Sequence, residues 1–279
     1  VLSNVIAWQY VFALNAPPSL KVNFLDIGQG DSVLIETPSR RHVMIDGGPG
    51  VQVMSKLQQK LPFWQKTIDV VVLTHPDADH LNGLLHVLQK YKVDYIVWTG
   101  IIRGGAPYEQ WVELLAKAEQ RGTKIIIGNM GDRIINGNAE LLILHPFEDL
   151  AGQDFRPKNQ TNDTGIVSRL TYGKQSFLFT ADISSEKEQE IVQAGIPLNS
   201  DMLKAAHHGS KYSSSDAFLQ AVNPKFAVIQ AGKDNSYGHP TPEVLQRLEN
   251  RDITYYRNDI NGGITFISDG ANYVVSLEK

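Results

Sequence analysis

The segment Val71-Val72-Leu73-Thr74-His75-Pro76-Asp77-Ala78-Asp79-His80 decides how this chain is interpreted. An apolar run of the kind found in a buried strand leads into four metal-capable side chains, at positions 75, 77, 79 and 80. Alternate residues of an extended chain point the same way, so His75, Asp77 and Asp79 are expected to converge. His80 is expected to turn inward where a helix begins. The segment therefore predicts a metal site between a strand end and a helix start.

The composition narrows the kinds of protein and of site that fit. The chain has 279 residues, 42% of them hydrophobic, which is enough for one large α/β domain with a full core. Its formal net charge of −4 does not fit a protein that coats nucleic acid, so any polyanion must be attracted locally. The chain has no cysteine, which excludes disulfides, thiolate metal sites and cysteine nucleophiles. Metal ligands must come from His, Asp and Glu.

Two parts of the chain differ in character. Residues 1–19 form an apolar segment with Trp8 and Tyr10 before Pro17 and Pro18, shorter than the ~20 residues that span a bilayer. This segment is interpreted either as the end of a membrane helix, as an interfacial anchor, or as an element packed on the domain. Residues 20–279 are interpreted as the folded domain.

The pattern of apolar runs predicts two layers of strands with helices outside them. Three short strands precede the metal segment, at 21–26, 32–37 and 42–46, and are expected to form an antiparallel meander. Leu81, Leu84, Leu85 and Leu88 recur at helical spacing after it. Further strands are expected at 69–73, 94–98, 124–127, 132–135, 140–144, 166–171, 176–180, 201–206, 225–230, 253–256, 263–267 and 273–276.

Helices are expected from about Val53, over 108–120, from a capping box at Ser185 to Glu188, and from Thr241. Residues 146–164 are polar and are expected to form a long loop. This order fits a four-layer αββα sandwich, and an ordinary α/β domain nearly as well.

Two later strand ends carry more ligand-type side chains, Asp182 after one strand and the pair His207 and His208 after another. Imidazoles and carboxylates without sulfur suit Zn²⁺ or Mn²⁺. A carboxylate such as Asp182 has two oxygens and can bridge two metal ions, which lower the pKa of bound water from 15.7 to roughly 7. The residues therefore predict a hydrolase with two divalent ions, for which phosphodiesters are suitable substrates.

The motifs resemble those of the metallo-β-lactamase superfamily. Residues 75–80 are similar to its His-x-His-x-Asp-His signature with Asp77 in place of the second His, 180–182 to its Thr-Gly-Asp, and 206–210 to its closing His motif. A closer resemblance is to the metallo-β-lactamase-like domain of the ComEC-type competence DNA-uptake channel proteins. It rests on residues 26–32, 45–48, 75–80, 207–211 and 237–243.

This resemblance implies an αββα fold and a nuclease that degrades the non-transforming strand of DNA. It implies a soluble domain of an integral membrane protein, at the extracytoplasmic face of the cytoplasmic membrane. DNA, as a single strand or a duplex end, and the competence machinery are the implied partners.

Transfer from the family implies a set of ligands: His75, Asp77, Asp79, His80, Asp182 and one of His207 or His208. We favour His208 as the ligand and His207 as a contact to phosphate or water. The separate His that the superfamily has before Asp182 is missing, and Asn162, Asp163 and Thr164 stand in that region. Hence we expect one metal ion to be weakly held, with partial occupancy or a preference for Mn²⁺ as the two hypotheses.

Other residues are assigned around this set. Asp79, His207 and His239 are the candidates for catalytic roles, His239 as a general acid or phosphate donor. Asp26, Asp31 and Asp46 either hold ligand imidazoles or form loop turns. Ser210 and Lys211, with Lys204 and Lys233, could meet phosphate, although most basic residues form a solvated face. Tyr212 and Tyr237 are either base-stacking platforms or, as we favour, core residues.

Two alternatives to a DNA nuclease stay open. The same fold class hosts hydrolases of small phosphodiesters, lactones and thioesters. A DNA-guiding module of a membrane channel would also keep the motif, for binding and not for cleavage. Cleavage of DNA in the presence of divalent ions separates these hypotheses.

Overall fold

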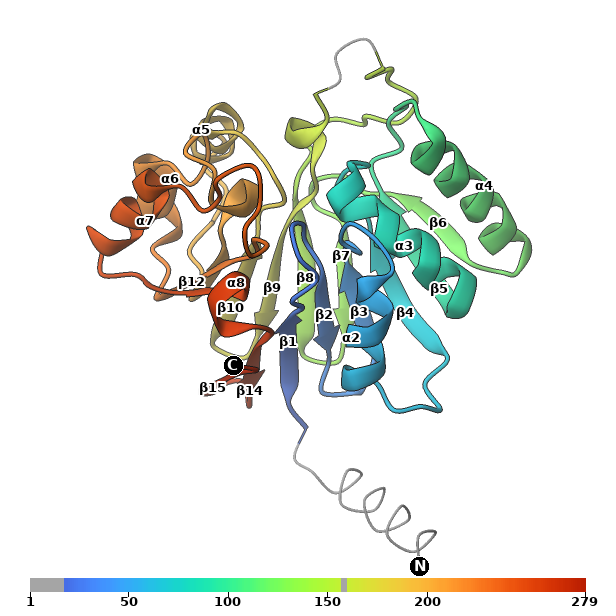
Figure 1. Cartoon of the computed structure of the whole chain (residues 1–279), viewed down its shortest axis with the longest axis horizontal. Helices are drawn as coiled ribbons and strands as arrows, with labels where there is room; N and C mark the ends of the chain where they lie inside the picture. Colours follow the sequence, from blue (N-terminus) through green and yellow to red (C-terminus); the bar gives the residue numbers. More distant parts are fainter. Residues whose placement is uncertain (1–17, 157–159) are drawn as a thin grey trace, which may run out of the picture.

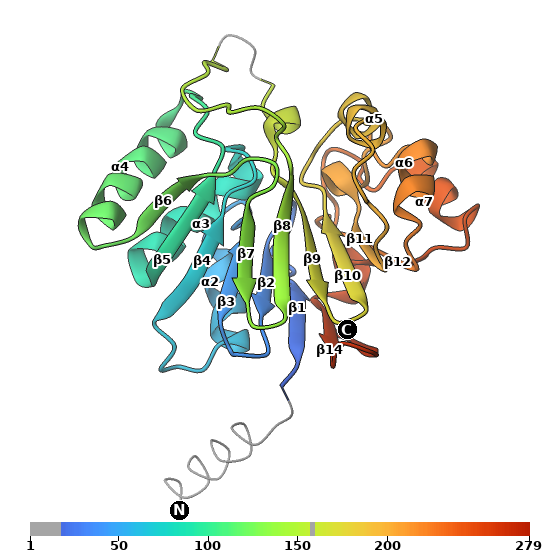
Figure 2. The same ribbon diagram turned by 180° about the vertical axis from the view of Figure 1, so that it is seen from behind.

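The computed structural model describes residues 18–156 and 160–279. Two β-sheets pack face to face, and helices cover the outer face of each (Figures 1 and 2). The predicted four-layer αββα sandwich is therefore confirmed. The interpretations of the apolar N-terminal segment fall on residues 1–17, which lie outside the described residues.

The strands form a sheet of eight and a sheet of seven. The first sheet contains, in spatial order, β15 (Tyr273–Leu277), β14 (Ile264–Ser268), β1 (Leu20–Phe24), β2 (Val33–Glu36), β3 (His42–Ile45), β4 (Thr67–Val72), β5 (Lys92–Trp98) and β6 (Lys124–Ile127). The second contains β13 (Thr254–Arg257), β12 (Phe226–Ile229), β11 (Met202–Lys204), β10 (Gln175–Phe179), β9 (Val167–Tyr172), β8 (Ala139–His145) and β7 (Arg133–Asn136).

Helices from the two halves of the chain cover opposite faces of the sandwich (Figure 1). Those packed on the first sheet are α2 (Gln52–Lys60), α3 (Ala78–Lys90) and α4 (Ala106–Gln120). Those packed on the second are α5 (Ser185–Gln193), α6 (Asp216–Val222) and α7 (Pro242–Glu249). The short helices are η1 (Asn162–Thr164), η2 (Ala206–Gly209) and α8 (Asn258–Asn261).

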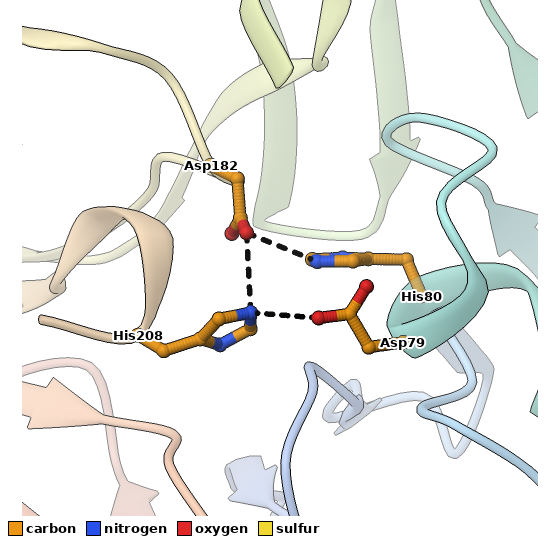
Figure 3. Close-up of side chains that lie close together, drawn as sticks. All are labelled: Asp79, His80, Asp182 and His208. Atoms are coloured by element: carbon orange, nitrogen blue, oxygen red, sulfur yellow. Dashed lines mark hydrogen bonds and ion pairs between the residues drawn. The ribbon is translucent and has the colours of Figure 1, made fainter. Parts of the chain in front are cut away.

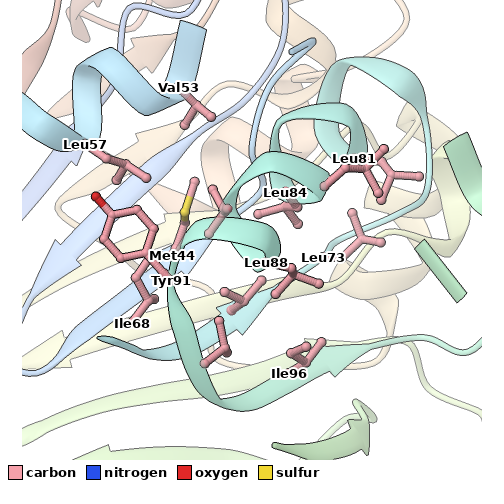
Figure 4. Packing of buried hydrophobic residues seen from close by; sticks show 14 of the residues in the cluster. Met44, Val53, Leu57, Ile68, Leu73, Leu81, Leu84, Leu88, Tyr91 and Ile96 are labelled. Atoms are coloured by element: carbon pink, nitrogen blue, oxygen red, sulfur yellow. The ribbon is translucent and has the colours of Figure 1, made fainter. Parts of the chain in front are cut away.

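Three layers of buried apolar side chains hold the four structural layers together. In β4, Val70 and Val72 pack between the sheets, whereas Val71 packs under the helices of the first sheet. This alternation is expected of a strand buried on both faces. Figure 4 shows the outer layer, where Leu84 and Leu88 of α3 meet Met44 of β3. The apolar run before His75 is thus the central strand that carries the metal segment.

The start of α3 differs from the sequence prediction. Asp77 is its N-cap and the helix begins at Ala78, so the extended chain ends before Asp79. Asp79 and His80 are therefore successive residues of a first helical turn, and the alternation expected of an extended stretch does not place Asp79. The buried face of α3 does include Leu81, Leu84, Leu85 and Leu88 as predicted.

The start of α5 is also shifted from the predicted capping box. Ser184, not Ser185, is the N-cap and accepts a hydrogen bond from the backbone N–H of Lys187. Glu188 does not cap the helix. It is buried and accepts hydrogen bonds from the backbone N–H groups of Ser214 and Ser215. The side chain joins α5 to the loop before α6.

The polar stretch between β8 and β9 is a loop, as predicted, in its described residues 146–156 and 160–166. Its regular structure is limited there to a bridge between Ile102 and Asp154 and to η1. In the described parts of the chain, no helix combines the length and the hydrophobicity that a membrane span requires.

Candidate metal centre

The carboxyl ends of parallel strands bring the predicted ligands together. Asp46 follows β3, and the segment with His75 follows β4, its parallel neighbour. In the second sheet, Asp182 follows β10 and His208 follows β11, which pairs with β10 in parallel. Parallel strands end at one edge of their sheet, so the ligands of each sheet gather at one edge.

Four of these side chains form a compact group, the metal tetrad: Asp79, His80, Asp182 and His208. Their ligand atoms all lie within 4.8 Å of one another. Asp182 Oδ2 lies 3.4 Å from His80 Nε2 and 3.1 Å from His208 Nε2 (Figure 3). His208 Nε2 also lies 3.2 Å from Asp79 Oδ2. Ligands from both sheets thus meet at the Asp182 carboxylate.

The hydrogen bonds of the imidazoles decide which nitrogen faces the centre. His80 Nδ1 lies 2.8 Å from Asp46 Oδ2, and His208 Nδ1 lies 2.9 Å from the carbonyl oxygen of Gln230. A carboxylate and a carbonyl can only accept, so each Nδ1 donates. Each Nε2 is therefore turned toward the carboxylates of the tetrad, which is how imidazole ligands of metal ions are usually oriented.

Asp46 orients a third histidine through Thr74. The Asp46 carboxylate accepts hydrogen bonds from the Thr74 backbone N–H at 2.8 Å and from its hydroxyl at 2.7 Å. Because that hydroxyl donates its one hydrogen to Asp46, it accepts from His75 Nδ1 at 3.0 Å. The Nε2 atoms of His75 and His80 are buried with no hydrogen-bond partner among the described residues, which fits metal ligands.

His75 lies beside the tetrad, with its ring centroid 4.1 Å from that of His80, and forms a looser pair with Asp77. His75 Nε2 lies 3.9 Å from Asp77 Oδ2. Asp77 Oδ1 accepts a hydrogen bond from Thr161 and pairs with Arg103 Nε at 2.9 Å. The groups are those of a dinuclear centre, with one position more tightly assembled than the other.

The electrostatics of the tetrad favour positive charge. Burial opposes ionisation of Asp182, but the charges of His208, His80 and Lys204 hold its pKa well below the ordinary value. Burial likewise opposes a charged His80 or His208, yet carboxylates raise the pKa of both well above the usual range, with Asp182 contributing most. Such a carboxylate-rich, buried group suits a divalent cation.

Lys204 has a different position from the one expected. Its ammonium is buried, forms an ion pair with Asp31 and lies 3.3 Å from Asp182 Oδ1 and 2.8 Å from the carbonyl oxygen of Ala181. It cannot meet phosphate there. Lys204 thus contacts Asp182 through Oδ1, whereas the imidazoles of His80 and His208 approach Oδ2. Asp31 lies 3.2 Å from His208 Nδ1.

The backbone of the histidine pair is strained. His207 and His208 have φ values of 50° and 54°, in the left-handed region that residues with a Cβ rarely adopt. The turn directs the two rings differently. His208 is buried in the tetrad, whereas the side chain of His207 is 32% exposed and its Nε2 lies 3.9 Å from Asp182 Oδ2. His207 lies at the rim with Asn162, whose Nδ2 is 3.4 Å from its Nε2.

A cavity of about 150 Å³ opens onto the tetrad. It is lined by Gln29, Asp77, Asp79, Asn162, Asp182, His207, His208, Tyr237 and His239. Burial, together with the charges of His207 and His208, lowers the pKa of His239 to about 4. The cavity is therefore rimmed by imidazoles over a carboxylate floor.

Like Asp31 and Asp46, the predicted residues Asp26, Ser210 and Lys211 do not line this cavity. Asp26 pairs with Lys279 Nζ at 3.3 Å. Ser210 is buried and its hydroxyl accepts from the backbone N–H of Tyr212, while Lys211 Nζ lies over the Tyr212 ring. A larger cavity of about 470 Å³ lies elsewhere, at the sandwich edge where Tyr95, Ile126 and Ile135 meet, and it is lined by no histidine.

Sequence reasoning missed several groups that shape the centre, namely Thr74, Arg103, Thr161, Gln29 and the carbonyl of Gln230. Thr74 directly precedes His75, which is a signal that could have been used. Gln29 lies within the motif at residues 26–32, whereas Arg103, Thr161 and Gln230 come from distant segments and carry no local motif.

A His/Asp cluster at the strand ends of an αββα sandwich defines a class, the metal-dependent hydrolases of this fold. The model of the metallo-β-lactamase superfamily matches residues 25–233, and the chain belongs to this superfamily. ComE operon protein 3 of Bacillus subtilis strain 168 is 32% identical over 263 residues, which cover 88% of this chain and 33% of that protein. Competence protein ComA of Neisseria gonorrhoeae is 31% identical, over 88% of this chain and 32% of that protein. The chain thus spans about a third of the length of these relatives.

Solved structures share the fold at low identity. Igni18, a metallo hydrolase from Ignicoccus hospitalis, is 14% identical with a TM-score of 0.52, over 88% of this chain and 98% of that one. Tm1679, a metal-dependent hydrolase of the β-lactamase superfamily, is 11% identical with a TM-score of 0.52, over 93% of this chain and all of that one.

Proposed function

We propose that this protein is a divalent-metal-dependent nuclease that hydrolyses DNA phosphodiester bonds. The observation that carries the proposal is the Asp182 carboxylate, which lies between imidazoles from both sheets at the floor of a polar cavity. When bound there, divalent ions supply Lewis acidity and activate water for attack on phosphorus.

The cavity wall supports a phosphate-containing substrate. None of the described side chains that line it is aliphatic, whereas an acyl lactone or thioester would need apolar surface for its chain. Gln29, Asn162, His207 and His239 offer hydrogen-bond donors around the opening. Its volume of about 150 Å³ suits a phosphate group with the rest of the substrate outside.

The residues of the chain have separate roles in this proposal. Asp79, His80, Asp182 and His208 would hold one metal ion, and His75 and Asp77, beside Asp182, would hold the other more weakly. His207 and His239, whose ring centroids are 5.5 Å apart, would donate hydrogen bonds to the phosphate oxygens through their ring N–H groups. Arg103 fixes Asp77 through their ion pair.

The biological role that we propose is removal of one DNA strand during DNA uptake. The support is the similarity to competence protein ComA of Neisseria gonorrhoeae. The domain would then act at the extracytoplasmic face of the cytoplasmic membrane, as part of a longer membrane protein and beside the rest of the competence machinery.

The test is cleavage of end-labelled single-stranded and duplex DNA by metal-stripped protein supplied with Zn²⁺, Mn²⁺ or Mg²⁺. We expect cleavage with Mn²⁺, and its loss in Asp79→Ala while the circular dichroism spectrum is unchanged. Binding of DNA without cleavage under any of these ions would point to a guiding module. Turnover of a lactone with intact DNA would contradict the nuclease proposal.

A further inference from the structure

A row of rings connects the metal tetrad with the surface. His80 and His208 have centroids 5.5 Å apart, and His208 and His239 have centroids 6.4 Å apart with planes inclined by 32°. Tyr237 continues the row, because its ring stacks on His239 at 5.9 Å with an angle of 23°. The row ends in an aromatic ring at the mouth of the cavity.

Tyr237 is not a core residue. Its 68% exposure contradicts the packing role favoured from the sequence. One face of the ring lies against His239, so the exposure leaves the other face to solvent. Among the residues that line the cavity, Tyr237 provides the only phenyl face.

The turn that carries this ring is held firmly. Asn235 Oδ1 accepts hydrogen bonds from the backbone N–H groups of Tyr237 and His239, and its Nδ2 donates to the carbonyl oxygens of Gly232 and His239. Gly232 in turn packs closely against the backbone of Gln29, because a Cβ on Gly232 would lie 2.6 Å from the Gln29 backbone nitrogen. The ring is therefore preorganised against the wall of the cavity.

We infer that Tyr237 is a base-stacking platform, which seats the nucleobase next to the phosphate that enters the cavity. The inference rests on the proposed nuclease function and specifies its substrate as single-stranded DNA. A base within a duplex has both faces covered by its neighbours, whereas an unpaired base presents a free face. Stacking is tolerant of base identity, so the platform would accept any sequence.

Tyr212 provides a matched control. It is exposed to the same extent, 68%, and its ring is covered on one side by the Lys211 ammonium at 5.2 Å. Unlike Tyr237 it does not line the cavity. Substitution of either exposed tyrosine should leave the circular dichroism spectrum and the midpoint of urea unfolding unchanged.

The experiment uses single-stranded oligonucleotides with one abasic nucleotide, placed in turn at each position, and measures KM and kcat at each bond with Mn²⁺. For the wild type, we expect KM at bonds beside the abasic position to rise about 5- to 150-fold, the range that corresponds to about 1–3 kcal/mol for one stacked base. On the intact strand, Tyr237→Ala should already have the raised KM that the wild type has beside the abasic nucleotide. On the strand with the abasic nucleotide, the KM of Tyr237→Ala should not increase further. Tyr237→Phe and Tyr212→Ala should behave like the wild type.

The possible failures are distinct. If the wild type cleaves single strands but an abasic nucleotide has no effect, or if Tyr237→Ala keeps the wild-type dependence, the platform is wrong and the nuclease proposal stands. If the wild type cleaves no oligonucleotide with any divalent ion, the nuclease proposal fails and the platform with it.

Discussion

A single buried carboxylate, Asp46, sets the orientation of two histidines at the centre. It accepts from His80 Nδ1 directly and from the Thr74 hydroxyl that holds His75. Its φ of 56° lies in the left-handed region, which Asn tolerates as well as Asp does. Asparagine also has the same shape as aspartate, so the Asp46→Asn substitution changes the hydrogen bonds and leaves the packing unchanged.

We expect Asp46→Asn to weaken metal binding by about 10- to 100-fold, the usual effect of removing such an orienting group. The amide places an N–H₂ group where Asp46 accepts, so His80 or Thr74 loses its partner. Competition of the protein with a metal-binding dye measures the affinity. Asp69→Asn is the control. Asp69, like Asp46, accepts a hydrogen bond from a backbone N–H, and it accepts a second one from an arginine, but it lies away from the tetrad. Equal affinity in Asp46→Asn and wild type would contradict the assignment.

Helix α3 and the loop after β3 meet at a pair of glycines. Gly83 of α3 packs on Gly47, just after β3, so closely that a Cβ on Gly83 would lie 1.8 Å from the Gly47 carbonyl oxygen. The Gly47 backbone N–H donates to the carbonyl oxygen of His80 at 2.7 Å. The contact fixes the first turns of α3 against the loop that holds Asp46.

Gly83→Ala is expected to lower the free energy of unfolding by about 1–3 kcal/mol. Alanine gains about 1 kcal/mol of helix propensity over glycine, but the clash with backbone outweighs that gain. Urea denaturation followed by circular dichroism measures the difference. His86→Ala, at an exposed position of the same helix, should change stability by less than about 0.5 kcal/mol. A stabilised Gly83→Ala protein would show that the two elements are not in contact.

The junction between α5 and the loop before α6 depends on Glu188. Burial raises the pKa of Glu188 to about 7, although the backbone N–H groups of Ser215 and Ser214 act in the opposite direction. In the folded state the group binds a proton more tightly than in the unfolded chain, where the ordinary value is 4.5. Its contribution to stability is therefore complete below about pH 4.5 and is lost as the pH rises through 7.

Glu188→Gln should remove this part of the pH dependence. Between pH 5 and pH 8 we expect the wild type to lose on the order of 1–3 kcal/mol relative to the variant, because only the wild type must ionise a buried group. Urea denaturation at several pH values gives the difference curve. Glu190→Gln, which removes only an exposed partner of Lys187, should give a flat curve. A flat curve for Glu188→Gln as well would disprove the raised pKa.

At the scale of the whole molecule, the pattern of apolar runs fitted the four layers, and an ordinary α/β domain nearly as well, and it did not predict the contacts between the layers. The continuous apolar run of Val70, Val71 and Val72 predicts a strand buried on both faces, and the ligands after it follow from position alone. The bond from His80 to Asp46 joins residues 34 positions apart, and that from His208 to Gln230 joins residues 22 apart. Such pairs depend on the order of parallel strands, which apolar periodicity does not encode.

The same limit explains the residues that were misjudged. Lys204 has the sequence context of a surface lysine near a phosphate site, but β11 lies inside the second sheet, so its side chain is buried against Asp31. Tyr237 looks like a core aromatic, but it belongs to a turn at the rim of the cavity. Burial of a side chain is a property of neighbouring strands and loops, and only the assembled fold supplies it.

The metal tetrad joins the two sheets, since Asp79 and His80 follow β4 of the first sheet and Asp182 and His208 follow β10 and β11 of the second. An ion held by all four side chains binds the folded state only, because the unfolded chain does not keep these side chains together.

Metal at 100 times its Kd would stabilise the protein by about 2.7 kcal/mol. At about 2–4 °C per kcal/mol, the Tm should rise by about 5–10 °C over that of chelator-treated protein. Asp182→Asn should abolish the rise, whereas Asp69→Asn, which alters a carboxylate outside the tetrad, should keep it. Thermal unfolding by circular dichroism over a series of Mn²⁺ concentrations measures both, and a Tm that is independent of metal in the wild type would mean that the tetrad does not link the two halves through an ion.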